Sequence, residues 1–250
     1  MPDTLPPALA RLVDLLAGMP GVRAVALGGS RAEGTADPHS DWDLAVYYRG
    51  AVDTAALSAL GTVHPPGAWG RIMNGGAWLT VEGAKMDVLL RDLDAAERWT
   101  AEAERGAYEV DGLLGYLAGI PTYSLTAELA TGRVLAGELP AVGGFPPALA
   151  AAAPGQWRFR AGFSLHHARM RAERGELAGA LGQAARAAME GAHALLCERA
   201  EWALNEKRLL ERAGLAAALN PLFGPAAPAS ADAAPAWVAR VGEVLGIAGG

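Results

Sequence analysis

The hydrophobic pattern of the chain changes near its middle, and this change constrains the fold more than any other feature. Before residue 140, short apolar runs such as 22–27 and 41–48 are separated by glycine-containing and polar turns, which is typical of strands. After residue 155, almost every segment is compatible with a helix. The sequence therefore predicts an α+β fold with a small mixed β-sheet domain and its flanking helices at 1–140, a linker rich in Pro, Gly and Ala at 141–154, and a helical bundle at 155–250.

Local signals divide the first half further. The segments 68–73, 77–83 and 85–92 are strand-like, and Gly83 predicts a hairpin turn between the last two. Residues 120–137 predict a helix followed by its exit turn.

Charge and cysteine content narrow the classes of partner and site. The chain has 27 acidic and 21 basic side chains and a net charge of −6, and no run of Lys and Arg stands out. A nucleic-acid partner is therefore disfavoured, because phosphate neutralisation supplies most of the affinity of such proteins. The single cysteine, Cys197, excludes an internal disulfide and a multi-cysteine metal site. No targeting pattern or run of about 18 apolar residues is visible, so we expect a cytoplasmic protein without a membrane partner.

One short segment carries most of the chemistry, and it begins with the turn Gly28-Gly29-Ser30 after a predicted strand. Glycines allow the backbone to approach a phosphate closely, and Ser30 adds a hydroxyl where the N-cap of a short helix is expected. The turn is not a Walker A motif, because no Gly-Lys-Ser/Thr follows the glycines. We therefore interpret Gly29 and Ser30 as candidate triphosphate ligands.

The same segment continues with two aspartates, Asp41 and Asp43, in the predicted strand 41–48. Alternation along a strand places residues i and i+2 on one face, so the two carboxylates project together. Their repulsion is relieved by a cation, and Mg²⁺ suits carboxylates combined with phosphate oxygens. A two-metal site needs a third carboxylate, and Asp87 in the strand-like run 85–92 supplies one.

Together these residues form a recognisable pattern. The stretch LGGSRAEGTADPHSDWDLAV resembles the signature of the DNA polymerase β-like nucleotidyltransferase superfamily, and the two-domain layout is similar to antibiotic nucleotidyltransferases of the kanamycin and streptomycin type. The resemblance implies transfer of a nucleoside monophosphate, usually AMP from ATP, to an acceptor hydroxyl. It also implies that Gly29 and Ser30 bind the triphosphate, that Asp41 and Asp43 hold two Mg²⁺ ions, and that Asp87 binds the catalytic metal and helps to deprotonate the acceptor.

Three further side chains are candidates, each with an alternative. Arg31 contacts phosphate or is a solvated helix residue, and Glu128 is a base or a residue of a helix surface or cap. Lys207 lies in the helical half, where similar enzymes often use a basic residue to reach the triphosphate; the alternative is an ordinary surface lysine.

The expected acceptor is a small-molecule hydroxyl, an aminoglycoside-like one among the candidates. A protein or tRNA end, or a catalytically silent nucleotide-binding relative, are the alternatives.

Overall fold

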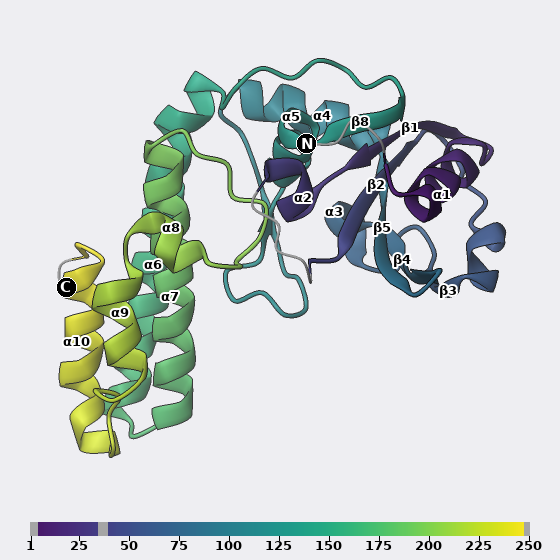
Figure 1. Ribbon diagram of the computed structural model, residues 1–250. Coiled ribbons are helices and arrows are strands. Elements are labelled where there is room, and N and C mark those ends of the chain that lie inside the picture. Colours follow the sequence, from purple (N-terminus) through teal and green to yellow (C-terminus); the bar gives the residue numbers. More distant parts are fainter. Residues whose placement is uncertain (1–4, 35–39, 248–250) are drawn as a thin grey trace. The chain divides into compact units, whose positions relative to one another are not determined.

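The computed structural model describes residues 5–34 and 40–247, which divide into two compact units (Figure 1). The first unit contains residues 1–101 and 125–144, and the second contains 102–124 and 145–250. None of the helices in the described ranges combines the length and the apolar character that a membrane span needs.

The first unit is built on a six-stranded mixed sheet in the order β3-β4-β5-β2-β1-β8. The central strands β2 and β5 are parallel, and every other neighbouring pair is antiparallel. The sheet and its helices confirm the predicted α+β class. The elements of this part of the chain are α1 (Pro7–Ala17), β1 (Val22–Leu27), α2 (Gly29–Glu33), β2 (Trp42–Tyr48), the 3₁₀-helix η1 (Ala55–Ala59), β3 (Gly61–His64), α3 (Gly70–Met73), β4 (Gly75–Val81), β5 (Ala84–Asp92), α4 (Leu93–Glu104), α5 (Ser124–Thr131) and β8 (Arg133–Gly137).

Helix α1 packs against one face of this sheet. Its apolar side chains recur at helical spacing, and Leu9 and Leu16 are fully buried in one core with Leu44 of β2 and Val88 of β5. Because side chains alternate along a strand, the residues next to Leu44 and Val88 point to the opposite face.

The turn predicted at Gly83 is confirmed. Val81 of β4 pairs with Ala84 of β5, so Glu82 and Gly83 form a two-residue hairpin loop. Their φ angles are 52° and 81°. Two positive φ values in succession are the requirement of the type I′ turn that joins twisted strands most easily.

Two predictions of local structure in this unit are wrong. Residues 70–73, expected in a strand, form α3, because the chain reverses direction between β3 and β4 and closes the reversal with bonds such as Trp69 N to Asn74 O (2.9 Å). Residues 133–137, expected in a helix exit, form the edge strand β8 beside β1. That pairing joins segments about a hundred positions apart, which local periodicity does not encode.

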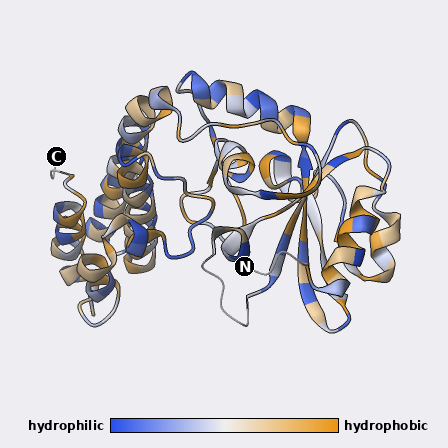
Figure 2. Cartoon of the chain, turned by 45° about the horizontal axis from the view of Figure 1, so that its top comes forward, coloured by the Kyte–Doolittle hydropathy of each residue, from blue (hydrophilic) through white to orange (hydrophobic). Residues whose placement is uncertain are grey.

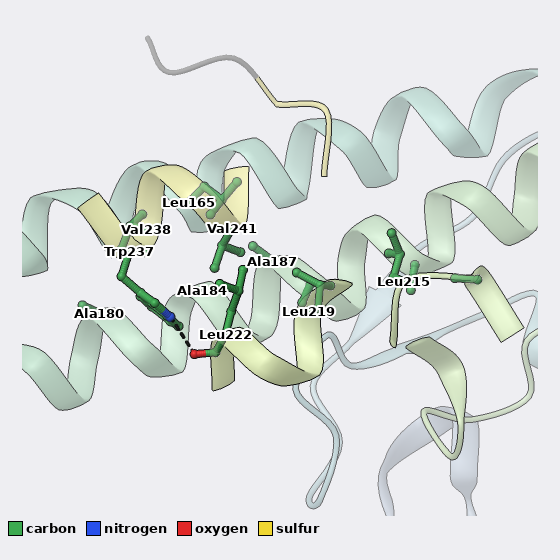
Figure 3. Packing of buried hydrophobic residues seen from close by; sticks show 14 of the residues in the cluster. Leu165, Ala180, Ala184, Ala187, Leu215, Leu219, Leu222, Trp237, Val238 and Val241 are labelled. Atoms are coloured by element: carbon green, nitrogen blue, oxygen red, sulfur yellow. Dashed lines mark hydrogen bonds between the residues drawn. The ribbon is translucent and has the colours of Figure 1, made fainter. Parts of the chain in front are cut away.

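From α6 onward the second unit is helical, as predicted, and its helices carry both hydrophobic and hydrophilic residues (Figure 2). Alanines of α7 form a smooth surface on which larger side chains such as Leu165, Leu219 and Trp237 pack (Figure 3). Trp237 also donates its indole N–H to the Leu222 carbonyl at 2.7 Å. The elements are β6 (Val110–Asp111), β7 (Ile120–Pro121), α6 (Pro147–Glu173), α7 (Leu177–Glu198), α8 (Leu209–Ala213), α9 (Ala216–Phe223), η2 (Ala231–Ala233) and α10 (Ala234–Val244).

The segment predicted as a linker, 141–154, is partly helical. Its residues 147–154 form the start of α6, with Pro147 at the first helical position, where a missing N–H costs nothing. The alanines that suggested a linker are strong helix formers. In addition, 102–124 clusters with the helices rather than with the sheet, because Tyr123 is buried beside Trp157 of α6.

Candidate active site

The register of the parallel strands brings two of the predicted carboxylates together. Asp43 of β2 lies directly opposite Asp87 of β5. Opposite residues in neighbouring strands point to the same face, with about 4.8 Å between the strands. Their sequence neighbours Leu44 and Val88 are buried in the α1-facing core, so both carboxylates project from the other face, where each is half-buried.

The third carboxylate, Asp41, is exposed and immediately precedes β2. Burial raises the pKa of Asp87 above its ordinary value, and the negative charge of Asp41 raises it further, whereas Lys85 acts in the opposite direction. Asp41 precedes Trp42, which lies opposite Met86, so Asp41 lies at the same end of β2 and β5 as the Asp43–Asp87 pair. The described part of the chain nevertheless contains no group of three His, Cys, Asp or Glu side chains arranged to hold a metal ion.

The glycine turn lies against Asp43 from the β1 side. The Gly28 N–H donates to the Asp43 carbonyl at 2.8 Å. Gly29 has a φ of +62°, and a Cβ atom placed on it would lie 2.0 Å from Asp43 Oδ2. Only glycine therefore permits this approach of the turn to the carboxylate. The helix α2 begins at Gly29 with Gly28 as its N-cap, so Ser30 lies inside the first turn and is not the cap that was expected.

Arg31 has backbone partners that the sequence did not indicate. Its guanidinium donates to the Ser40 carbonyl at 2.6 and 3.1 Å and to the Asp41 carbonyl at 3.1 Å. It also lies 4.1 Å from the centroid of the Trp42 ring, a cation–π contact. Arg31 thus fixes the entry into β2, where the carboxylates begin.

Glu128, the predicted base, is the counter-ion of a buried arginine. Its Oε1 accepts a hydrogen bond from Arg91 Nη2 at 2.7 Å, and its Oε2 accepts one from Arg91 Nε. Arg91 is only 1 % exposed and donates also to the Met73 carbonyl at 2.8 Å. A carboxylate engaged in this way stabilises the fold, which favours the structural alternative for Glu128 over the role of a base.

Lys207 belongs to the second unit, where it is exposed in the turn before α8, not on a helix surface. Its backbone N–H donates to Asn205 Oδ1 at 2.9 Å. Its contact with a triphosphate stays a prediction.

The second unit has a cleft of its own between α6 and α7. Two exposed aromatic side chains, Phe159 and Phe163, line it together with Arg186. Glu190 is buried there, and it accepts hydrogen bonds from Ser164 Oγ at 2.7 Å and from Arg186 Nε at 2.9 Å. The hydrogen bond from Ser164 joins α6 to α7, whereas the ion pair of Arg186 with Glu190 lies within α7.

Sequence reasoning missed one prominent residue of the sheet face. Trp78 of β4 lies directly opposite Asp87 and is 53 % exposed. Its ring centroid lies 4.6 Å from that of His64, which lies 4.9 Å from that of Trp69. A tryptophan in a strand pattern is ordinarily interpreted as core, and only the alternation with buried Ala77 and Leu79 could have indicated an outward direction.

Comparison with known proteins relates the segment that holds these carboxylates to a family. Residues 9–100 match the model of the nucleotidyltransferase domain family. Among solved structures, a nucleotidyltransferase-like protein from Exiguobacterium sibiricum is similar, with 13 % sequence identity and a TM-score of 0.48 over 96 % of this chain and 73 % of that one. No curated protein matches. The family match confirms the predicted reaction class, whereas the likeness to antibiotic-modifying enzymes stays a prediction. The matched region, residues 9–100, contains Asp41, Asp43 and Asp87 and supports nucleotidyl transfer as the activity of the protein.

Proposed function

We propose that the protein transfers AMP from ATP to a hydroxyl of a small molecule and releases pyrophosphate, with Mg²⁺ as the metal and an aminoglycoside-like compound among the candidate acceptors. The observation that carries this proposal is the in-register pair Asp43 and Asp87 with Gly29 packed against Asp43. Such a pair offers oxygen ligands for a cation beside a glycine backbone that a phosphate group could approach.

The donor set fits magnesium. Mg²⁺ keeps several waters and is usually held by one or two carboxylates plus substrate phosphates, so a site without a complete protein cage is the expected arrangement. Asp41, Asp43 and Asp87 would hold two ions. When bound, these ions would neutralise charge on the α-phosphate and on the leaving pyrophosphate.

The remaining chemistry is assigned to the residues of the chain. Gly29 and Ser30 bind the β- and γ-phosphates, and Arg31 keeps the chain before β2 in place through the Ser40 and Asp41 carbonyls. The acceptor hydroxyl oxygen forms a bond to the α-phosphorus while the bond from this phosphorus to the oxygen that bridges to the β-phosphate breaks. The hydroxyl proton passes to the Asp87 carboxylate, and pyrophosphate leaves.

The test uses ATP labelled at the α-phosphate, MgCl₂ and a panel of acceptors that contains aminocyclitols, neutral sugars, tRNA and protein. We expect label on a small molecule with stoichiometric pyrophosphate, and an Asp43→Asn variant reduced by about 10²–10³-fold because several kcal/mol of transition-state stabilisation are lost. Asp14→Asn, an exposed change in α1, is the matched control and should retain full activity. Full turnover in Asp43→Asn would refute the site, and label on tRNA or protein alone would refute the acceptor class.

A further inference from the structure

The residue that the proposed reaction leaves unexplained is Trp78. It lies on β4 in the same cross-strand row as the carboxylates, opposite Asp87, and leaves 53 % of its surface in water. Its strand neighbours Ala77 and Leu79 are buried in the core. A large aromatic side chain that is exposed beside carboxylates leaves apolar surface in contact with water unless a ligand covers it.

The ring of Trp78 packs against other aromatic side chains. It meets His64 edge to face, with an interplanar angle of 72°, and His64 packs against Trp69. Trp69 in turn lies over Gly76, where a Cβ atom would come within 2.6 Å of the Trp69 ring. These contacts fix the orientation of the indole, so a ligand that stacks on the ring does not have to pay the entropy cost of ordering this side chain.

The strand order shows where Trp78 lies relative to the carboxylates and the glycine turn. Across the sheet, the row reads Gly28 at the end of β1, Asp43 on β2, Asp87 on β5 and Trp78 on β4. With strands about 4.8 Å apart, Trp78 is roughly 5 Å from the backbone of Asp87 and roughly 10 Å from that of Asp43. Trp78 and the glycine turn thus lie on opposite sides of the carboxylate pair.

This arrangement matters because the attacking and leaving oxygens of phosphoryl transfer lie roughly in line on opposite sides of the phosphorus. If pyrophosphate leaves on the side of Gly29, as the proposed function requires, the acceptor enters from the side of Trp78. We infer that Trp78 is the platform on which the acceptor stacks, and that the acceptor is a ring with several hydroxyls, a cyclic polyol or its aminated form.

The chemistry of the two neighbours selects this class. The indole face contacts the C–H face of a ring, and the adjacent Asp87 carboxylate accepts a hydrogen bond from a hydroxyl at the edge of that ring. An amino substituent would gain a cation–π contact with Trp78, while the positive charge of exposed Lys85, on β5 with Asp87, would repel it. Both kinds of acceptor therefore need hydroxyls on a ring, and the experiment compares a ring without amino groups with one that carries them.

The experiment measures acceptor and donor separately. myo-Inositol and 2-deoxystreptamine are the probes, and their binding to the full chain with Mg²⁺ and a non-hydrolysable ATP analogue is followed by saturation-transfer NMR alongside the kinetic constants. We expect Trp78→Ala to weaken acceptor binding and raise the acceptor KM by about tenfold while the KM for ATP stays unchanged. Trp78→Phe should restore most of the binding. Thr80→Ala, the next outward residue of β4, is the matched control and should behave as wild type.

Each outcome decides a separate point. A rise in the KM for ATP with an unchanged acceptor KM would assign Trp78 to the nucleobase, which overturns the inference and leaves the proposed function intact. Unchanged constants in Trp78→Ala would overturn it as well, as would ring binding that Trp78 does not affect. If wild type binds a probe through Trp78 but transfers no label to any acceptor, the proposed function fails and the platform stands.

Discussion

Replacing Gly29 by alanine tests how the glycine turn positions Asp43. The new Cβ atom would lie 2.0 Å from Asp43 Oδ2, whereas real Cβ contacts essentially never fall below 3.0 Å. The carboxylate must therefore move by about 1 Å or more, and a misplacement of that size at a reacting centre costs about 10²-fold in rate. The backbone also has a φ of +62°, so alanine adds a conformational cost of about 1–2 kcal/mol.

Gly34 provides a matched control at the other end of α2. Its φ is +73°, which imposes the same conformational cost on alanine, but its Cβ atom would meet no heavy atom within 4 Å in the described part of the chain. Urea unfolding and transfer of labelled AMP are measured for both variants. We expect a similar loss of stability in Gly29→Ala and Gly34→Ala, about 1–2 kcal/mol, and a loss of about 10²-fold in kcat for Gly29→Ala alone. Equal activities of the two variants would show that the contact between Gly29 and Asp43 does not position the catalytic carboxylate.

Two further predictions concern buried side chains that can carry a charge. Glu128→Ala leaves Arg91 buried without its Glu128 counter-ion and should lower the free energy of unfolding by about 3–5 kcal/mol. Glu128→Gln keeps a hydrogen-bond acceptor, so it should lose less stability and retain the wild-type pH profile of kcat. A folded but inactive Glu128→Gln would restore the role of a base. Burial lowers the pKa of His193 to about 3, with the charge of Arg212 acting in the same direction. As the pH falls, His193 therefore takes up a proton in the unfolded state before it does so in the folded state. The contribution of the neutral, buried side chain to the free energy of unfolding is complete above pH 6.5 and is lost as the pH falls toward 3, at about 1.4 kcal/mol per pH unit. In urea titrations from pH 7.5 to 4.5, His193→Phe should flatten this decline, and an unchanged slope would contradict the assignment.

Local chemistry in the sequence accounts for much of the first unit. Apolar runs bounded by glycines predicted β1, β2 and β5, because a strand needs only a short alternating or continuous hydrophobic segment. The turn at Gly83 was predictable because a two-residue hairpin depends on the residues inside it. The glycine turn followed by Asp41 and Asp43 resembles a nucleotidyltransferase signature, and this resemblance implied the reaction class that the family match confirms.

Only the tertiary structure determined the partners of these residues. The opposition of Asp43 and Asp87, the ion pair of Glu128 with Arg91 and the row that ends at Trp78 all join segments far apart in the chain. Periodicity specifies which side of an element is apolar, but it does not specify which other element covers that side. Strand order and register follow from the joint burial of many apolar surfaces. For that reason the sequence by itself indicated the reaction class, and the folded sheet decided which residues lie beside the carboxylates.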